Sequence, residues 1–286
     1  MVRCLCFFLL ITLFVLSSPS FSQNQLDPRA LDPEKDPDID MFMGNWQNSI
    51  PFNSHGSLTE RAILTKWDGD PLKPVKKGQV LLYVNRLTRA TLDPHASTTP
   101  TTLKGEQEIF YIMSGTGTVT GGGKTNDLRK GALFLAPEGI ECTMKNTGDE
   151  LLVMYLVNEP IREGYKPPKD IVINYEDEMP LRSTGYITVH WSHNGRGGIS
   201  GSSAGFGRLI YDPMTIGQPH SHDPGYEEVW LVTEGKNLAF LGKEIRWQYP
   251  GTAYRIPPTG YTPHTNINTT EEPVRFLIWI AQAPKK

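Results

Sequence analysis

The sequence contains very little cysteine: three residues, of which two are Cys4 and Cys6. Both lie in an N-terminal segment that we expect to be cleaved off, as described below. Only Cys142 then remains, so the mature chain cannot form an internal disulfide. Basic residues are also not in excess, with 28 Lys and Arg against 31 Asp and Glu. A net charge of -3 without a basic cluster argues against nucleic acid as a partner.

Long hydrophobic runs are scarce as well. The run at residues 4–16 has 13 residues, whereas a membrane-spanning helix needs about 20. Arg3 precedes this run and small residues up to Ser22 follow it, which is the pattern of a cleavable secretory signal. We expect residues 1–22 to be a signal peptide and the mature protein to be secreted or periplasmic, without membrane contact after cleavage. A retained membrane anchor is the alternative.

Turn-forming residues are abundant. The 27 Gly and 23 Pro often flank short runs of Val, Ile, Leu, Tyr and Phe, which is typical of an all-β protein built from short strands. Residues 23–40 carry three prolines and six acidic residues, so they are predicted to be an extended leader. Residues 79–87 are one of the strands that this pattern predicts. His55, between Ser54 and Gly56, is expected to be a solvated loop histidine without a function.

Potential metal ligands gather in residues 217–268. His220 and His222 are two positions apart, which in a strand places both side chains on one face. Glu228 and His264 complete a set of three imidazoles and one carboxylate, which suits a first-row transition metal and leaves coordination positions open. The alternative is a hydrogen-bonded histidine cluster without a metal. Glu227 is the rival carboxylate.

The two halves of the chain share their spacing. Six residues separate Glu108 from Gly115, and six separate Glu228 from Gly235. In each half the next glycine of the pattern follows 16 positions later. This correspondence predicts an internal repeat of one β unit, and it selects Glu228 over Glu227.

These spacings resemble the two motifs of the cupin superfamily, in which His-x-His and a glutamate precede a glycine, and a later Pro-x-Gly precedes a histidine and an asparagine. In the second half one extra residue stands before the glutamate and one before the histidine. The positions that match there are His220, His222, Glu228, Gly235, Gly251, Pro257, Gly260, His264 and Asn268. In the first half Cys142 stands at the histidine position, and only His95 and Ser97 are available for His-x-His.

The resemblance implies an all-β protein of two tandem cupin jelly-roll barrels. It places an N-terminal cupin with a decayed metal site at residues 41–160, a linker with incoming strands at 161–205 and a C-terminal cupin at 206–284. One divalent transition metal (Mn, Fe, Cu, Ni or Zn) is expected in the second barrel, held by His220, His222, Glu228 and His264. In the first barrel Cys142 is expected to be an inert thiol; the alternative is a soft metal site of His95, Glu108 and Cys142.

The function implied by the resemblance is that of an exported metalloenzyme, a dioxygenase or oxidase that oxidises a small polar substrate such as an organic acid, phenolic or sugar. The alternatives are a metal-dependent lyase or isomerase, or a non-catalytic cupin that binds a carbohydrate or other small ligand. A homodimer remains open. The catalytic residues are not identified by the sequence; the candidates are His193 as an acid or base, and Arg255 and Tyr261 because they stand near ligands.

Overall fold

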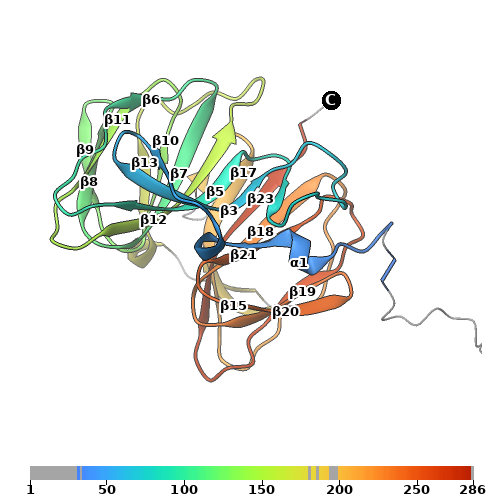
Figure 1. Cartoon of the computed structure of the whole chain (residues 1–286). Helices are drawn as coiled ribbons and strands as arrows, with labels where there is room; N and C mark the ends of the chain where they lie inside the picture. The colour runs from blue at the N-terminus through green and yellow to red at the C-terminus, as the bar shows by residue number, and fades with distance from the viewer. Residues whose placement is uncertain (1–30, 33, 180–181, 185–186, 193–198, 285–286) are drawn as a thin grey trace, which may run out of the picture. The chain divides into compact units, whose positions relative to one another are not determined.

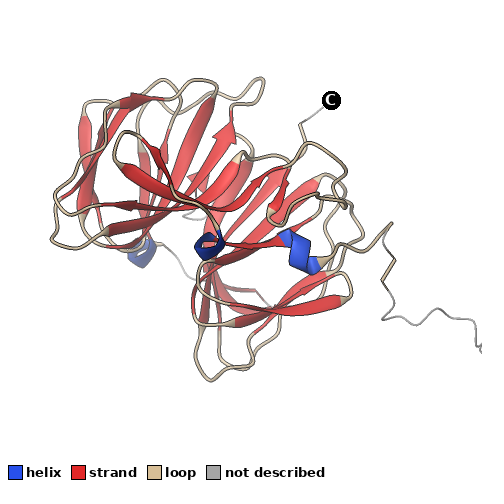
Figure 2. Ribbon diagram, viewed as in Figure 1, coloured by secondary structure: helices blue, strands red, loops and turns tan. Residues whose placement is uncertain are grey.

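The computed structural model of the chain describes residues 31–32, 34–179, 182–184, 187–192 and 199–284. Residues Leu31–Lys286 form one compact unit, and Figure 2 shows that nearly all of its regular structure is β-strand. The helical segments are short: α1 (Ile39–Phe42), η1 (Trp46–Asn48) and η2 (Glu176–Glu178). None of the described helices is long and apolar enough to cross a membrane. The predicted signal peptide, residues 1–22, lies outside the described residues.

The first half of the chain forms most of two sheets (Figure 1). The larger sheet has the order β13 (Val172–Tyr175), β10 (Ala132–Ala136), β7 (Glu106–Ser114), β12 (Leu152–Pro160), β5 (Arg86–Leu92), β3 (Leu58–Lys66) and β2 (Phe52–Ser54), with β4 (Gln79–Leu81) paired to β3. The smaller sheet has the order β6 (Thr101–Thr102), β11 (Glu141–Asn146), β8 (Gly117–Gly121) and β9 (Lys124–Leu128).

The second half repeats this arrangement. Its larger sheet has the order β1 (Met43–Asn45), β21 (Thr252–Ile256), β18 (Tyr226–Glu234), β23 (Val274–Gln282), β17 (Ala204–Tyr211), β15 (Ile187–Ser192) and β14 (Arg182–Thr184), with β16 (Ile199–Ser200) paired to β17. Its smaller sheet has the order β20 (Glu244–Gln248), β19 (Asn237–Leu241) and β22 (His264–Ile267). The predicted all-β class is therefore confirmed.

Turn residues of the repeat have the same conformation in both halves. Gly115 and Gly235 have φ angles of 87° and 80°, and Gly131 and Gly251 have φ angles of 85° and 81°. Only glycine adopts this left-handed region without strain, which is why the spacing of glycines was a reliable guide to the repeat. The equivalent strands β7 and β18 end directly before Gly115 and Gly235. The equivalent strands β10 and β21 begin directly after Gly131 and Gly251.

The two motif asparagines also have equivalent roles. The Asn146 side chain donates a hydrogen bond to the carbonyl of Glu150, four residues later, and accepts one from the amide of Gly148. The Asn268 side chain makes the same pair of contacts, with Glu272 and Thr270. Each asparagine is buried, and its side chain forms hydrogen bonds with backbone groups of the short loop that joins two strands. The asparagine therefore marks the equivalent loop in each repeat, directly before the last strand, β12 or β23.

Two strands cross between the halves. β1, at the N-terminal end, pairs with β21 of the second half, with Gly44 opposite Ala253. β13, within the predicted linker, pairs with β10 of the first half, with Phe134 opposite Ile173. Each half thus completes its larger sheet with a segment from the other side of the predicted boundaries. Those boundaries stay a prediction.

The predicted strand at residues 79–87 is interrupted. β4 ends at Leu81, and the amides of Leu82 and Tyr83 turn to donate hydrogen bonds of 2.8 and 3.3 Å to the carboxylate of Glu227. The chain becomes a strand again only at β5. A distant glutamate therefore overrides the β propensity of this segment.

Alternating residues of β7 belong to two different cores. Phe110 and Ile112 lie in the interior of the first barrel, whereas Ile109 and Tyr111 join a cluster shared with the second half. Both faces of the strand are buried, which explains its nearly continuous hydrophobic sequence. The shared cluster also contains Val229 and many other residues of the second half, so the two halves have one continuous apolar core between them.

Candidate metal centre

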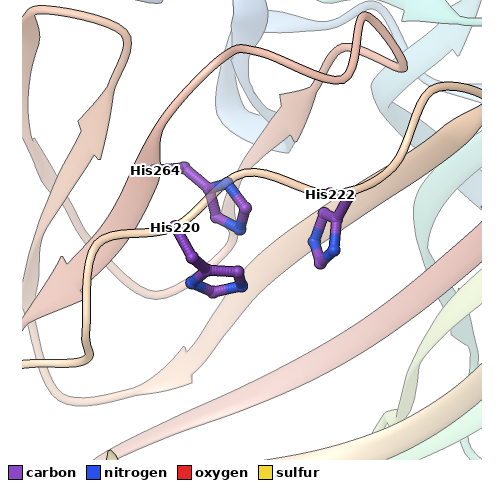
Figure 3. A group of neighbouring side chains, drawn as sticks. All are labelled: His220, His222 and His264. Atoms are coloured by element: carbon purple, nitrogen blue, oxygen red, sulfur yellow. The ribbon is translucent and has the colours of Figure 1, made fainter.

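Three histidine rings meet at the second barrel. His264 begins β22, and its backbone exchanges two hydrogen bonds with that of His220, which lies in an extended loop rather than in the predicted strand. His222 follows two residues later, and its ring lies on the same side as that of His220, with centroids 5.1 Å apart. Figure 3 shows the three rings together, His220 and His222 from one segment and His264 from another. One nitrogen from each ring lies within 4.8 Å of the others.

Glu228 points at these rings from β18. Its Oε2 accepts a hydrogen bond of 2.9 Å from Nε2 of His222 and lies 2.8 Å from Nε2 of His264. Burial by itself raises the pKa of this carboxyl, but the contacts with His222 and His264 outweigh burial and hold the pKa well below its usual range. Glu228 is therefore an ionised carboxylate inside a buried site.

A backbone contact fixes the tautomer of His220. Its Nδ1 lies 2.9 Å from the carbonyl oxygen of Gln218. Since a carbonyl can only accept, Nδ1 carries the proton and Nε2 of the neutral ring keeps its lone pair. Burial also lowers the pKa of His220, which favours this neutral form. The ring is therefore oriented and tautomerised as a metal ligand requires.

His264 supplies the test of whether a metal fits. The ring is fully buried, and neither nitrogen has a hydrogen-bond partner among the described residues, because the Glu228 contact does not meet hydrogen-bond geometry. A buried imidazole without partners loses the hydration that it has in water, at a cost of about 1–3 kcal/mol per unpaired group. Coordination to a metal would satisfy it. Three nitrogens and one carboxylate oxygen are also a donor set that first-row divalent ions accept, so the residues fit such an ion.

Of the candidate catalytic residues, Arg255 does not face this site. Arg255 stands opposite Val229 in the sheet, so its side chain projects from the face opposite to that of Glu228. It is fully buried, and its Nε lies 3.0 Å from Oε2 of Glu227. Arg255 therefore cannot border the entrance, as its place in the sequence suggested. Tyr261 lies in a loop with 51% of its surface exposed, and His193 lies outside the described residues.

Glu227 has a role that the sequence did not indicate. It is fully buried with Arg255, and it accepts the two backbone amides of the bend after β4. The repeat separated Glu227 from Glu228 by face, but alternation predicts only that Glu227 points away from the barrel interior. It could not show that the other half of the chain covers this face.

The strand register gives the counterparts of the histidines in the first barrel. Thr101 stands opposite Cys142, as His220 stands opposite His264. Cys142 therefore occupies the histidine position, and Thr101 with Leu103 occupies the His-x-His positions. His95 does not: its ring is 65% exposed and lies 2.9 Å from Asp149. The three-ligand site of His95, Glu108 and Cys142 is therefore not formed.

His55 was wrongly predicted to be a solvated loop residue. Its side chain is only 10% exposed, and Nε2 lies 3.0 Å from Oε2 of Glu108 inside the first barrel. It comes from the turn between β2 and β3, far from the motif in the sequence, and no spacing pointed to it. The sole local signal was its neighbour Gly56, which has a φ angle of 79° and allows the tight turn.

Comparisons with known proteins give one family match and several structural ones. Residues 88–158 match a family model described as Cupin domain, whereas no curated protein matches. The crystal structure of AerE from Microcystis aeruginosa is similar with a TM-score of 0.63 and 12% identity, over 84% of this chain and 99% of that chain. The formate complex of oxalate decarboxylase from Lactobacillus farciminis gives 0.62 and 13%, over 85% of this chain and 86% of that chain.

A structure of Bacillus subtilis oxalate decarboxylase concerned with its Mn(II) centres is similar with a TM-score of 0.60 and 13% identity, over 86% of this chain and 78% of that chain. At these identities the similarity concerns the fold. It extends over both halves of the chain, whereas the family match covers the first half only.

Proposed function

Since the chain contains a cupin domain and has the fold of two-domain cupins, we propose that it is a divalent-metal-dependent enzyme that acts on a small organic acid. The observation that carries the proposal is the convergence of three imidazoles and one ionised carboxylate in the second barrel. The ligands are His220, His222, Glu228 and His264. Non-catalytic binding of a small ligand is the competing function.

The charge of the site favours an anionic substrate. A divalent ion held by three neutral imidazoles and the Glu228 carboxylate keeps one net positive charge. Arg255 is engaged with Glu227 on the opposite face and supplies no charge here. A carboxylate substrate would therefore bind at the metal itself, which supplies Lewis-acid polarisation of a substrate oxygen when bound. The carbonyl of Gln218 holds the ring of His220 in one tautomer, and burial excludes water around His264.

Two reaction types are the first to test. The sequence resemblance led us to expect oxidation of the substrate. A lyase reaction that releases carbon dioxide is the second candidate, because two of the structurally similar proteins are oxalate decarboxylases. The metal is proposed to be Mn, Fe, Cu, Ni or Zn, and Mn is the first to test because of the Mn(II) centres of the Bacillus subtilis protein.

The test is reconstitution of metal-free protein with each of these ions, followed by incubation with oxalate, glyoxylate and other small carboxylates. Oxygen uptake and carbon dioxide release, recorded in parallel, separate oxidation from decarboxylation. Activity should require the metal and disappear in His264→Gln. An open coordination position should also let azide change the spectrum of the cobalt-loaded protein. A spectrum indifferent to azide, with no turnover of any carboxylate, would favour the binding module.

Export is proposed on the sequence pattern of residues 1–22. The expected result is a secreted or periplasmic protein whose N-terminus begins near Gln23, as read by N-terminal sequencing. Recovery of the full chain in the membrane fraction would support the anchor instead. Gel filtration with light scattering would determine whether the mature protein is a homodimer.

A further inference from the structure

The first barrel encloses a cavity that the metal-dependent function does not use. The space open to the centre of a water-sized group is ≈ 10 Å³, which is room for about one such group. The whole empty space, including the open mouth, is ≈ 330 Å³. Its walls are mostly apolar, with the stacked rings of Phe110 and Phe134 (centroids 4.6 Å apart) on one side. The lining residues are His55, Thr98, Thr101, Leu103, Glu108, Phe110, Val119, Phe134, Ala136, Ile140, Cys142 and Met144.

A buried charged pair stands in this apolar cavity. Oε1 of Glu108 accepts hydrogen bonds from Arg86 (2.8 Å) and Asn158 (3.1 Å), which hold the carboxylate in place. Oε2 lies 3.0 Å from Nε2 of His55, but this contact does not meet hydrogen-bond geometry. Among the described residues nothing donates a hydrogen bond to Oε2. One fully buried carboxylate oxygen in the cavity therefore has a free acceptor position.

His55 is held toward the cavity by its own loop. Its backbone has a φ angle of 49°, which is strained for a residue other than glycine. The carbonyl of His55 accepts the amide of Thr99, and Nδ1 lies 2.9 Å from the hydroxyl of Ser54. The turn between β2 and β3 is thus built to place an imidazole beside Glu108.

A metal ion does not explain this site. Burial and the nearby Glu108 charge raise the pKa of the Cys142 thiol to about 11, so the thiol is protonated at neutral pH in the metal-free barrel. Thr101 and Leu103 replace the first two histidines of the second barrel. In the parts of the chain that the structure describes, the cluster of three ligand atoms lies only at His220, His222 and His264.

We propose that the first barrel binds a small apolar molecule ending in one hydroxyl group, without a metal. A hydroxyl is both donor and acceptor, so it can donate to Oε2 of Glu108 and accept from His55. A hydroxyl has the size of the narrow interior, and the apolar part of the ligand would lie along the apolar walls toward the open mouth. A second carboxylate would be repelled by Glu108, so this ligand differs in class from the anionic substrate of the second barrel.

The test uses benzyl alcohol as the probe and toluene as its hydroxyl-free partner. Binding is followed by calorimetry and by the rate at which a small thiol reagent modifies Cys142, read on the Cys142 peptide by mass spectrometry. Benzyl alcohol should bind with one site per chain and slow this modification at least about tenfold at saturation. Toluene should bind at least about tenfold more weakly, because it donates no hydrogen bond to Oε2 of Glu108.

Variants assign the binding to the first barrel. Ala136→Phe fills the cavity, and Glu108→Gln removes the charged acceptor; both should abolish protection of Cys142. The equivalent substitution in the second barrel, Glu228→Gln, should leave it unchanged, which keeps this test separate from that of the metal site. Three results would each overturn the proposal: equal affinity for the two probes, no protection of Cys142 in the unmodified protein, or loss of protection in Glu228→Gln. These outcomes can be read even if Ala136→Phe fails to fold.

Discussion

At the scale of residues, two adjacent glutamates have opposite surroundings. Glu228 meets the histidine rings, whereas Glu227 neutralises the fully buried Arg255 and accepts the backbone of the bend after β4. Both are nearly unexposed, so burial alone does not distinguish them. The difference is one of partner: a histidine cluster for one and a permanent cation for the other.

Isosteric substitutions should separate these roles. Glu227→Gln leaves the Arg255 charge buried without its partner, which should lower the free energy of unfolding by about 3–5 kcal/mol. Glu228→Gln should abolish metal binding with a much smaller loss of stability. Urea denaturation and elemental analysis of both variants check this. Loss of metal in Glu227→Gln, with stability unchanged, would reverse the assignment.

The contact between His55 and Glu108 should make stability depend on pH. Burial and the charge of Arg86 lower the pKa of His55, whereas the contact with Glu108 and the charge of Glu60 raise it. The raising effects are larger, so the pKa of His55 lies above its ordinary value. A histidine whose pKa is raised in the folded state contributes stability. This contribution is fully present below the ordinary histidine pKa and is lost as the pH rises through the raised pKa. The stability lost in His55→Gln should therefore be larger at about pH 6 than at about pH 9.

The control is His95→Gln, because that ring is exposed and its removal breaks no buried contact. Urea midpoints of the three proteins at both pH values provide the comparison. A stability difference between wild type and His55→Gln that stays constant with pH would contradict the contact.

At the scale of elements, repeated turns explain why the sequence predicted so much of the fold. Left-handed glycines recur because no other residue adopts these φ angles cheaply, so their spacing is visible in a single chain. The crossing of β1 and β13 left no such mark, since a short strand has the same sequence pattern in either sheet. The same holds for His55, whose turn is an ordinary one until its partner Glu108 is known.

Two glycines with the same φ angle, 81°, separate backbone strain from packing. At Gly123 a Cβ would meet nothing within 4 Å, whereas at Gly251 it would lie 2.3 Å from Nε1 of Trp46 in η1. Gly123→Ala should cost about 1–2 kcal/mol from the left-handed conformation alone. Gly251→Ala should cost about 1–3 kcal/mol more, because the indole must move. Equal denaturation midpoints for the two variants would show that η1 does not pack on this turn.

At the scale of the whole molecule, the second barrel contains the three-histidine cluster, whereas the first has Cys142 and Thr101 at equivalent positions. The sequence predicted the tandem fold and the four ligands from spacing. It placed the counterparts of the histidines at His95 and Ser97, whereas the register places them at Thr101 and Leu103. Loop lengths differ between the halves, and a single sequence cannot show where a loop ends and a strand begins.

The most direct test of this account is the metal content of the whole protein. After reconstitution and removal of free ions, elemental analysis should find one divalent ion per chain. His264→Gln should reduce this to none, and Cys142→Ser should leave it at one, since the first barrel lacks a ligand set. Two ions per chain, or a full ion in His264→Gln, would contradict the assignment of a single metal centre to the second barrel.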